Sequence, residues 1–208
     1  KLCDQVSDAV LDACLTQDPK SKVACETVAK GNFVLVCGEI TSNAKINIEQ
    51  IVRDTIKEIG YDDVKKGIDY KTCDVVIKVT QQSQDISQSV HEKKSDDDIG
   101  AGDQGHMFGY ATDETKELFP LSHLLALKLS KRLAEVRKTK VLNYLRPDGK
   151  TQITVQYKQV GKNIVPFRVH NVLVSTQHDE DVKLEQLRAD IKEHVILNII
   201  PKELIDER

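Results

Sequence analysis

Apolar residues recur every three to four positions at the start of the chain, which is the period of an amphipathic helix. The apolar stripe runs from Leu2 to Cys14, while acidic and amide residues take the opposite side. Asp18-Pro19 ends the pattern, because the residue before a proline disfavours helical backbone. The spacing predicts a helix from Leu2 to the Asp18-Pro19 step.

Two runs rich in β-forming residues follow, Lys22 to Lys30 and Phe33 to Thr41. Only Gly31-Asn32 separates them, which has the length and composition of a tight hairpin turn. With that turn, residues whose numbers sum to 63 should face each other across the two strands.

A second helix and a strand complete the first half of the pattern. Asn47 is placed to cap the helix, with Gln50 in the capping-box position and Gly60 at its end. The run from Cys73 to Thr80 predicts a strand. The predicted order is therefore α-β-β-α-β.

Residues 85 to 105 interrupt this pattern. The segment is rich in Ser and Asp and contains three Gly. Between Asp85 and Asp103 it has six acidic residues and two basic residues. Such composition is typical of a mobile loop or linker. We expect it to separate an N-terminal domain, residues 1–84, from a central domain, residues 106–208.

The second half opens with a helix at Pro120, a residue favoured in the first helical turn. Its predicted apolar stripe comprises Leu118, Leu121, Leu125, Leu129, Leu133 and Val136. Arg146-Pro147-Asp148-Gly149 predicts a turn. Alternating residues then predict a strand from Ile153 to Tyr157.

A second strand, around Val165 to Ser175, should return after a turn at Gly161. We expect Asp179 or Asp181 to cap the last helix. The residues predicted to face inward from that helix are Leu184, Leu187, Ile191 and Val195.

The two halves share the α-β-β-α order and a short string, Ile48-Glu49-Gln50-Ile51 against Leu184-Glu185-Gln186-Leu187. This indicates an α+β fold of two tandem repeats, each a mixed sheet with helices on one face. The second repeat stops at Arg208 before a closing strand, and the chain begins inside a helical pattern without an initiator Met. We therefore expect segments to be missing at both ends.

The charge balance, the hydrophobic runs and the cysteine spacing exclude several kinds of partner and site. Thirty Lys and Arg against 33 Asp and Glu leave a net charge of −3, which argues against nucleic-acid binding. No apolar run approaches the roughly 20 residues needed to span a bilayer, and the sequence shows no signal-peptide h-region. Five cysteines without a C-x-x-C pair indicate neither a disulfide framework nor a zinc site. We expect a cytoplasmic protein that does not bind membranes.

The hairpin carries the first candidate site. In its predicted register Glu26 faces Cys37, and Glu39 lies two residues further along the same face. Cross-strand diagonals of about 7–8 Å would bring the two carboxylates together amid apolar neighbours. Such a pair attracts a cation or an ammonium group. The alternative is a solvated face with ordinary surface acids.

Two further segments are candidates for binding chemistry. The glycines of Gly100-Ala101-Gly102-Asp103-Gln104-Gly105 let the backbone approach a ligand closely, or they form a flexible linker. Lys150 begins a strand directly after the predicted turn, which would hold an ammonium in a defined place for a polyphosphate. A simply solvated lysine is the alternative.

These segments closely resemble S-adenosylmethionine synthetase (methionine adenosyltransferase) across essentially the whole chain, in a variant similar to eukaryotic members. The motifs that carry the resemblance are residues 1–10, Val23-Ala24-Cys25-Glu26-Thr27, Gly38-Glu39-Ile40-Thr41, residues 100–105, Met107-Phe108-Gly109-Tyr110-Ala111-Thr112, Arg146-Pro147-Asp148, Lys150-Thr151-Gln152 and Ser175-Thr176-Gln177-His178.

The resemblance implies a transferase that forms S-adenosylmethionine, phosphate and diphosphate from ATP, L-methionine and water. It also implies Mg²⁺ and K⁺ as cofactors and a homodimer or homotetramer as the assembly. By motif, Glu26 corresponds to a K⁺ ligand, and Glu39 and Gln82 correspond to methionine contacts.

Further roles follow from the same motifs. Asp103 would contact methionine or adenosine and take part in catalysis, and Asp148 with Gly149 would contact ATP. Lys150 would bridge the reacting centre and the phosphates. Residues from about Gln82 through Lys94 match the family's flexible gate.

The chain departs from the family pattern at two positions. Gln84 replaces the gate's usual proline, and His106 replaces an apolar residue. The family's Mg²⁺ ligand and its third domain would lie outside the chain, so we expect the 208 residues alone to be inactive. The alternative function is a non-catalytic ligand-binding or oligomerisation module with the same fold.

Overall fold

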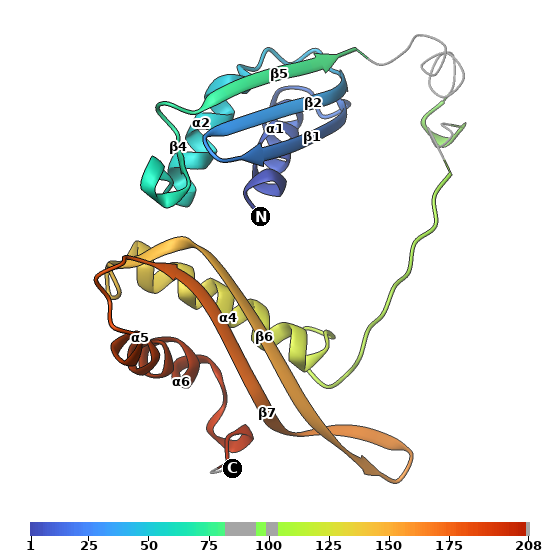
Figure 1. The fold of residues 1–208 in the computed structure, drawn as a ribbon. Coiled ribbons are helices and arrows are strands. Elements are labelled where there is room, and N and C mark those ends of the chain that lie inside the picture. The colour runs from blue at the N-terminus through green and yellow to red at the C-terminus, as the bar shows by residue number, and fades with distance from the viewer. Residues whose placement is uncertain (82–94, 99–103, 207–208) are drawn as a thin grey trace. The chain divides into compact units, whose positions relative to one another are not determined.

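The computed structural model describes residues 1–81, 95–98 and 104–206. The chain divides into two compact units, Lys1–Met107 and Phe108–Arg208, called here the N-terminal unit and the C-terminal unit (Figure 1). The predicted gate lies outside the described residues.

Helix α1 (Leu2–Gln17) opens the N-terminal unit and buries Val6, Val10 and Cys14, as its periodicity predicts. It ends at Asp18, whose backbone is extended. The Asp18 carboxylate accepts the backbone N–H groups of Asn43 and Lys20, and these bonds, the one from Asn43 first, lower the pKa of the carboxyl. The end of α1 is thereby tied to the segment that leads into the next helix.

Among residues 1–81, strands β1 (Lys22–Lys30), β2 (Phe33–Thr41) and β5 (Asp74–Thr80) form a sheet in the order β1-β2-β5. The hairpin prediction is confirmed, since Lys22 pairs with Thr41 and Lys30 with Phe33. Strand β5 joins β2 in parallel, so this sheet is mixed.

Helix α2 (Ile48–Ile59) has the predicted ends. The Asn47 side chain accepts the N–H of Gln50, and Gly60 closes the helix at a left-handed φ of 108°. The Gln50 side chain donates to Asp54 instead of reaching back to Asn47, so half of the capping box forms.

Both helices cover one face of the sheet, and no other helix among residues 1–81 covers the opposite face (Figure 1). On the face that the helices cover, Val34 and Val36 of β2 are fully buried. They pack with Val6 of α1 and with Val52 and Ile56 of α2. Burial of this apolar surface drives the packing of the layers.

The connection from α2 to β5 contains two short strands, β3 (Asp62–Asp63) and β4 (Ile68–Asp69), and the 3₁₀ turn η1 (Val64–Lys66). Arg53 of α2 donates to the carbonyl groups of Tyr70 and Cys73. These bonds satisfy backbone acceptors just before β5 begins.

Helix α4 (Leu121–Lys138) of the C-terminal unit begins after Pro120. Leu125, Leu129, Leu133 and Val136 of the predicted stripe are buried. Leu118 is not in the stripe, because it precedes the helix with a φ of 54° and is 58% exposed. The 3₁₀ turn η2 (Asp96–Asp98) lies before this unit.

Strands β6 (Leu145–Val160) and β7 (Asn163–His178) pair antiparallel around Gly161, whose φ is 63°. Within residues 104–206 no further strand joins them, so this sheet is not mixed. The hairpin packs on α4, which lies along one side of it in Figure 1.

The turn predicted at Arg146-Pro147-Asp148-Gly149 is wrong. These residues belong to β6, where the pairing shifts from Leu145–His178 to Gly149–Thr176. Pro147 lacks an N–H and falls where the ladder is interrupted, so the chain bulges instead of turning.

The predicted cap of the last helix is also wrong. Helix α5 (Leu184–Ile191) begins after Lys183, which makes no side-chain cap bond. Asp179 instead accepts the guanidinium of Arg146 at 2.7 Å, and Asp181 is not the cap. Leu184 is 57% exposed, which corrects the prediction that it faces inward.

The other inward residues of the last helix, Leu187, Ile191 and Val195, are buried as predicted. The helix continues as the π-helical segment η3 (Lys192–Ile196), helix α6 (Leu197–Ile199) and the 3₁₀ turn η4 (Lys202–Leu204). The architecture is α+β in both units. No helix in the described part of the chain is both long and apolar enough to cross a membrane.

Candidate active site

The open face of the N-terminal sheet, which we define as the face away from α1 and α2, carries the two predicted carboxylates. Glu26 pairs with Cys37 and Glu39 with Ala24, so both acids lie on this face as diagonal neighbours. Both side chains are exposed. The predicted juxtaposition is confirmed by the register, and within this unit the pair faces solvent.

Strand β5 adds a charge to the same face that the sequence pattern did not indicate. Lys78 pairs with Cys37, so Glu26, Cys37 and Lys78 form one row across the sheet. The next row is apolar, because Val28, Leu35 and Val76 pair in the same way. A parallel partner cannot be assigned from local sequence, so Lys78 was not among the candidates.

Gly38 separates the strand positions of Cys37 and Glu39 and has a φ of 137°. A β-carbon built there would lie 2.0 Å from the carbonyl oxygen of Ala24. Only glycine tolerates this backbone, so Gly38 fixes how closely the strands approach beside Glu39.

The second group of candidates, Asp148, Gly149 and Lys150, lies on β6 where its bulge ends. Lys150 and Asp148 are exposed, whereas Gly149 is partly buried. A β-carbon on Gly149 would lie 2.6 Å from Cδ2 of Leu133, so α4 packs directly beneath this point.

The strand beyond Lys150 is fastened to α4. The Thr151 hydroxyl donates to the carbonyl of Ala126 at 2.7 Å and is 2.7 Å from the Ser130 hydroxyl. Because neighbouring residues on a strand point to opposite faces, this anchor directs Lys150 away from α4. A lysine whose backbone is anchored on an open sheet face suits contact with a large anion.

Gln82 and Asp103, the remaining candidates, lie outside the described residues.

The side chains of the described residues limit which cations the chain can bind. Within residues 1–81, 95–98 and 104–206, no group of three or more His, Cys, Asp or Glu is arranged to hold a metal ion. Glu26 and Glu39 provide carboxylate oxygens, the donor type that hard cations prefer. They can supply part of a K⁺ shell.

The cysteines lie in the N-terminal unit, and within residues 1–81 all five are free thiols. Burial raises the pKa of Cys14, Cys25 and Cys73. These thiols therefore stay protonated and pack as small apolar groups.

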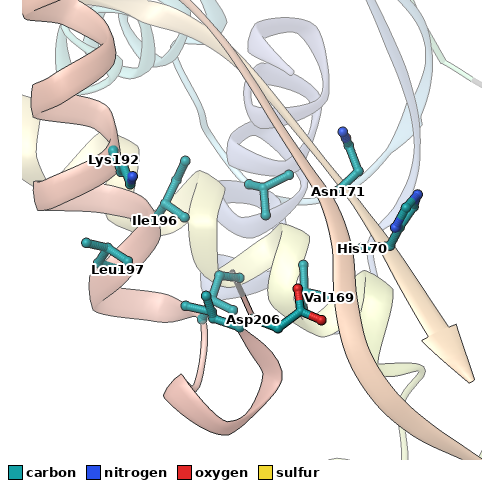
Figure 2. A pocket seen from close by; sticks show the side chains of 10 residues that line it. Val169, His170, Asn171, Lys192, Ile196, Leu197 and Asp206 are labelled. Carbon is teal, nitrogen blue, oxygen red and sulfur yellow. The ribbon is translucent and has the colours of Figure 1, made fainter. Parts of the chain in front are cut away.

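A pocket of about 280 Å³ lies in the C-terminal unit, between β7 and the segments that follow α5. Figure 2 shows His170 and Asn171 on the strand across from Lys192, Ile196 and Leu197. It contains none of the predicted site residues, and no sequence motif marks it.

Two residues that line this pocket, His170 and Asp206, contact the side chain of Arg168. Its guanidinium donates to Asp206 at 3.0 Å and to Gln156 at 2.6 Å, and lies 2.8 Å from Nδ1 of His170. Asp206 itself lines the pocket. The Arg168 guanidinium is therefore already bound by Gln156, Asp206 and His170.

Family models match both units of the chain. Residues 1–84 match the N-terminal domain of S-adenosylmethionine synthetase, and residues 98–208 match its central domain. The matched segments contain the open face with Glu26 and Glu39 and the anchored strand with Lys150. The chain belongs to the S-adenosylmethionine synthetase family.

Proposed function

We propose that this chain forms part of a methionine adenosyltransferase, which converts ATP, L-methionine and water to S-adenosylmethionine, phosphate and diphosphate. The observation that carries the proposal is the family match over both units, which includes the segments with the carboxylate pair and Lys150. A cytoplasmic homodimer or homotetramer is the proposed form of the enzyme.

In the proposed reaction the methionine sulfur attacks C5′ of the ATP ribose, and the bond from C5′ to the triphosphate oxygen breaks. The sulfur becomes a sulfonium, and the bonding electron pair leaves with the triphosphate. Water then cleaves the triphosphate to phosphate and diphosphate. Bound Mg²⁺ and K⁺ would neutralise part of the phosphate charge.

Lys150 is proposed to stabilise the leaving group. Its ammonium is held by a strand that Thr151 fastens to α4, so it needs little reorganisation when charge develops. Asp148 and Gly149, directly before it, are proposed to contact ATP. The exposed position of Lys150 leaves room for a polyphosphate.

The carboxylate pair is proposed to divide two tasks. Glu39 would bind the methionine ammonium, and Glu26 would provide one ligand to K⁺. The proposal draws support from their shared face, because a substrate ammonium and a monovalent cation need neighbouring negative charges. Gln82 and Asp103 keep the methionine-binding roles that the family pattern gives them, and Asp103 its catalytic role.

Isotope transfer tests this function. An enzyme that contains this chain should convert methyl-labelled methionine and ATP to labelled S-adenosylmethionine, detected by mass spectrometry. The 208 residues alone should give no labelled product. Among their described residues, no group of three or more His, Cys, Asp or Glu is arranged to hold a metal ion such as Mg²⁺. Methionine binding without product in the larger protein would favour the ligand-binding module instead.

A further inference from the structure

Three charged side chains from three strands meet on the open face of the N-terminal sheet. Glu26 and Lys78 both pair with Cys37, from opposite sides of β2. Glu39 lies two residues beyond Cys37, so it is a diagonal neighbour of both Glu26 and Lys78. Lys78 is therefore a diagonal neighbour of Glu39, and Cys37 alone separates it from Glu26 across the sheet.

Distance allows the ammonium to reach both acids. Adjacent strands lie about 4.8 Å apart, so Glu26 and Lys78 are separated by about 10 Å at the backbone. A lysine stem and a glutamate side chain together can cover that span. All three side chains are exposed, and among the described residues none of them forms an ion pair.

The other lysines on this face, Lys22 and Lys30, lie farther from the carboxylate pair in the strand register. Lys22 pairs with Thr41 and is diagonal to Glu39, but it lies two rows from Glu26. Lys30 pairs with Phe33 and lies two rows from Glu26 in the other direction. Of the described lysines on this face, Lys78 is thus the one that shares a row with Glu26 and is diagonal to Glu39.

We propose that Lys78 acts as a built-in monovalent cation for the Glu26–Glu39 pair and competes with K⁺ at this place. An ammonium and K⁺ carry the same charge, and either one reduces the repulsion between two carboxylates. With Lys78 between the acids, their net charge falls from −2 to −1, so an external cation binds less strongly. This inference rests on the proposed role of Glu26 as a K⁺ ligand.

Nuclear magnetic resonance of the lysine ammonium groups tests the geometry directly. In the 208-residue chain, Glu26→Gln and Glu39→Gln should each shift the Lys78 Nζ resonance, while the Lys30 resonance stays in place. Lys30→Met is the matched control, since it removes a lysine from the same face but borders neither acid. A Lys78 resonance unmoved by both substitutions overturns the proposal.

Cation-dependent stability provides a second readout that does not require activity. The wild-type melting temperature should be only slightly higher in KCl than in choline chloride at the same ionic strength, because Lys78 weakens K⁺ binding without abolishing it. Lys78→Met should enlarge this difference, with K⁺ binding about fivefold tighter, the scale of one exposed charge contact. Lys30→Met should behave like the wild type. Equal melting temperatures of Lys78→Met in the two salts count against competition.

The two proposals fail separately. If Glu26→Gln shifts the Lys78 resonance but leaves K⁺ activation of the active enzyme unchanged, Lys78 is the counter-ion and the K⁺ role of Glu26 is wrong. If Glu26→Gln weakens K⁺ activation but Lys78 does not respond, the K⁺ role remains and the built-in cation is rejected.

Discussion

Gly38 lies against the carbonyl oxygen of Ala24 so closely that a β-carbon there would come within 2.0 Å of it. This contact lies within the β1–β2 ladder, directly before Glu39, which pairs with Ala24. The carboxylate pair is therefore positioned by backbone, before any side-chain contact is made.

Gly38→Ala should destabilise the N-terminal unit by about 2–4 kcal/mol, because it adds a clash to a backbone conformation that costs about 1–3 kcal/mol by itself. Gly31→Ala is the control, since its φ is 57° and nothing lies within 4 Å of the added carbon. Denaturant unfolding measures both. A Gly38→Ala loss no larger than that of Gly31→Ala would show that the strands separate without strain.

The carboxylate pair should show a division of roles in the active enzyme. Glu26→Gln should weaken K⁺ activation, because one cation ligand loses its charge. Glu39→Gln should chiefly raise the KM for methionine, because the substrate ammonium loses its partner. Steady-state kinetics at varied K⁺ and methionine separate the two, and unchanged values for both variants would contradict the assignment.

Lys150→Met should reduce kcat by roughly 10²- to 10³-fold, the scale of losing one preorganised electrostatic contact. The KM values for ATP and methionine should change far less, since the ammonium acts mainly on charge that develops in the transition state. Lys162→Met, at the exposed hairpin turn, is the control. A near-normal kcat for Lys150→Met would leave it a solvated surface lysine.

The Tyr157 hydroxyl should lose its proton at a higher pH than an ordinary tyrosine. Burial, followed by donation of its hydroxyl to Glu114 at 2.8 Å, raises its pKa to about 12. A raised folded-state pKa stabilises the fold below the ordinary value near 10, and this contribution is lost as pH rises through about 12. Carbon-13 chemical shifts of labelled tyrosine report the titration. Glu114→Gln should move it toward the ordinary value, and an unchanged midpoint would leave burial as the sole cause.

Asp190 gives the opposite pH dependence in the same unit. The Tyr144 hydroxyl donates to it at 2.6 Å, and this bond, followed by the one from Gln186, lowers its pKa. The stabilisation is present above the unfolded pKa of about 3.9 and is lost as pH falls through the lower folded value. Tyr144→Phe should cost about 1 kcal/mol at pH 7.

Unfolding free energies measured from pH 7 down to pH 2 check this assignment. The difference between wild type and Tyr144→Phe should shrink below pH 4, where Asp190 takes up a proton. A difference that is constant with pH would assign the effect to packing of the ring.

The local sequence determined the elements whose signals are short-range. The turn Gly31-Asn32 set the whole register of β1 and β2, because a two-residue turn leaves one way to pair the strands. Asn47 and Gly60 likewise set the ends of α2 through bonds to backbone within four residues. From that register the sequence also predicted that Glu26 and Glu39 share a face.

Tertiary structure decided the features that depend on distant partners. Asp179 could not be recognised as a partner of Arg146 instead of a cap, because they are 33 residues apart in sequence. Arg146 lies within the bulge that replaced the predicted turn. Lys78 reaches the carboxylate pair only because β5 returns, after α2, to lie parallel to β2. Parallel pairing requires a long crossover, so its register follows from packing of the helix and not from a local turn.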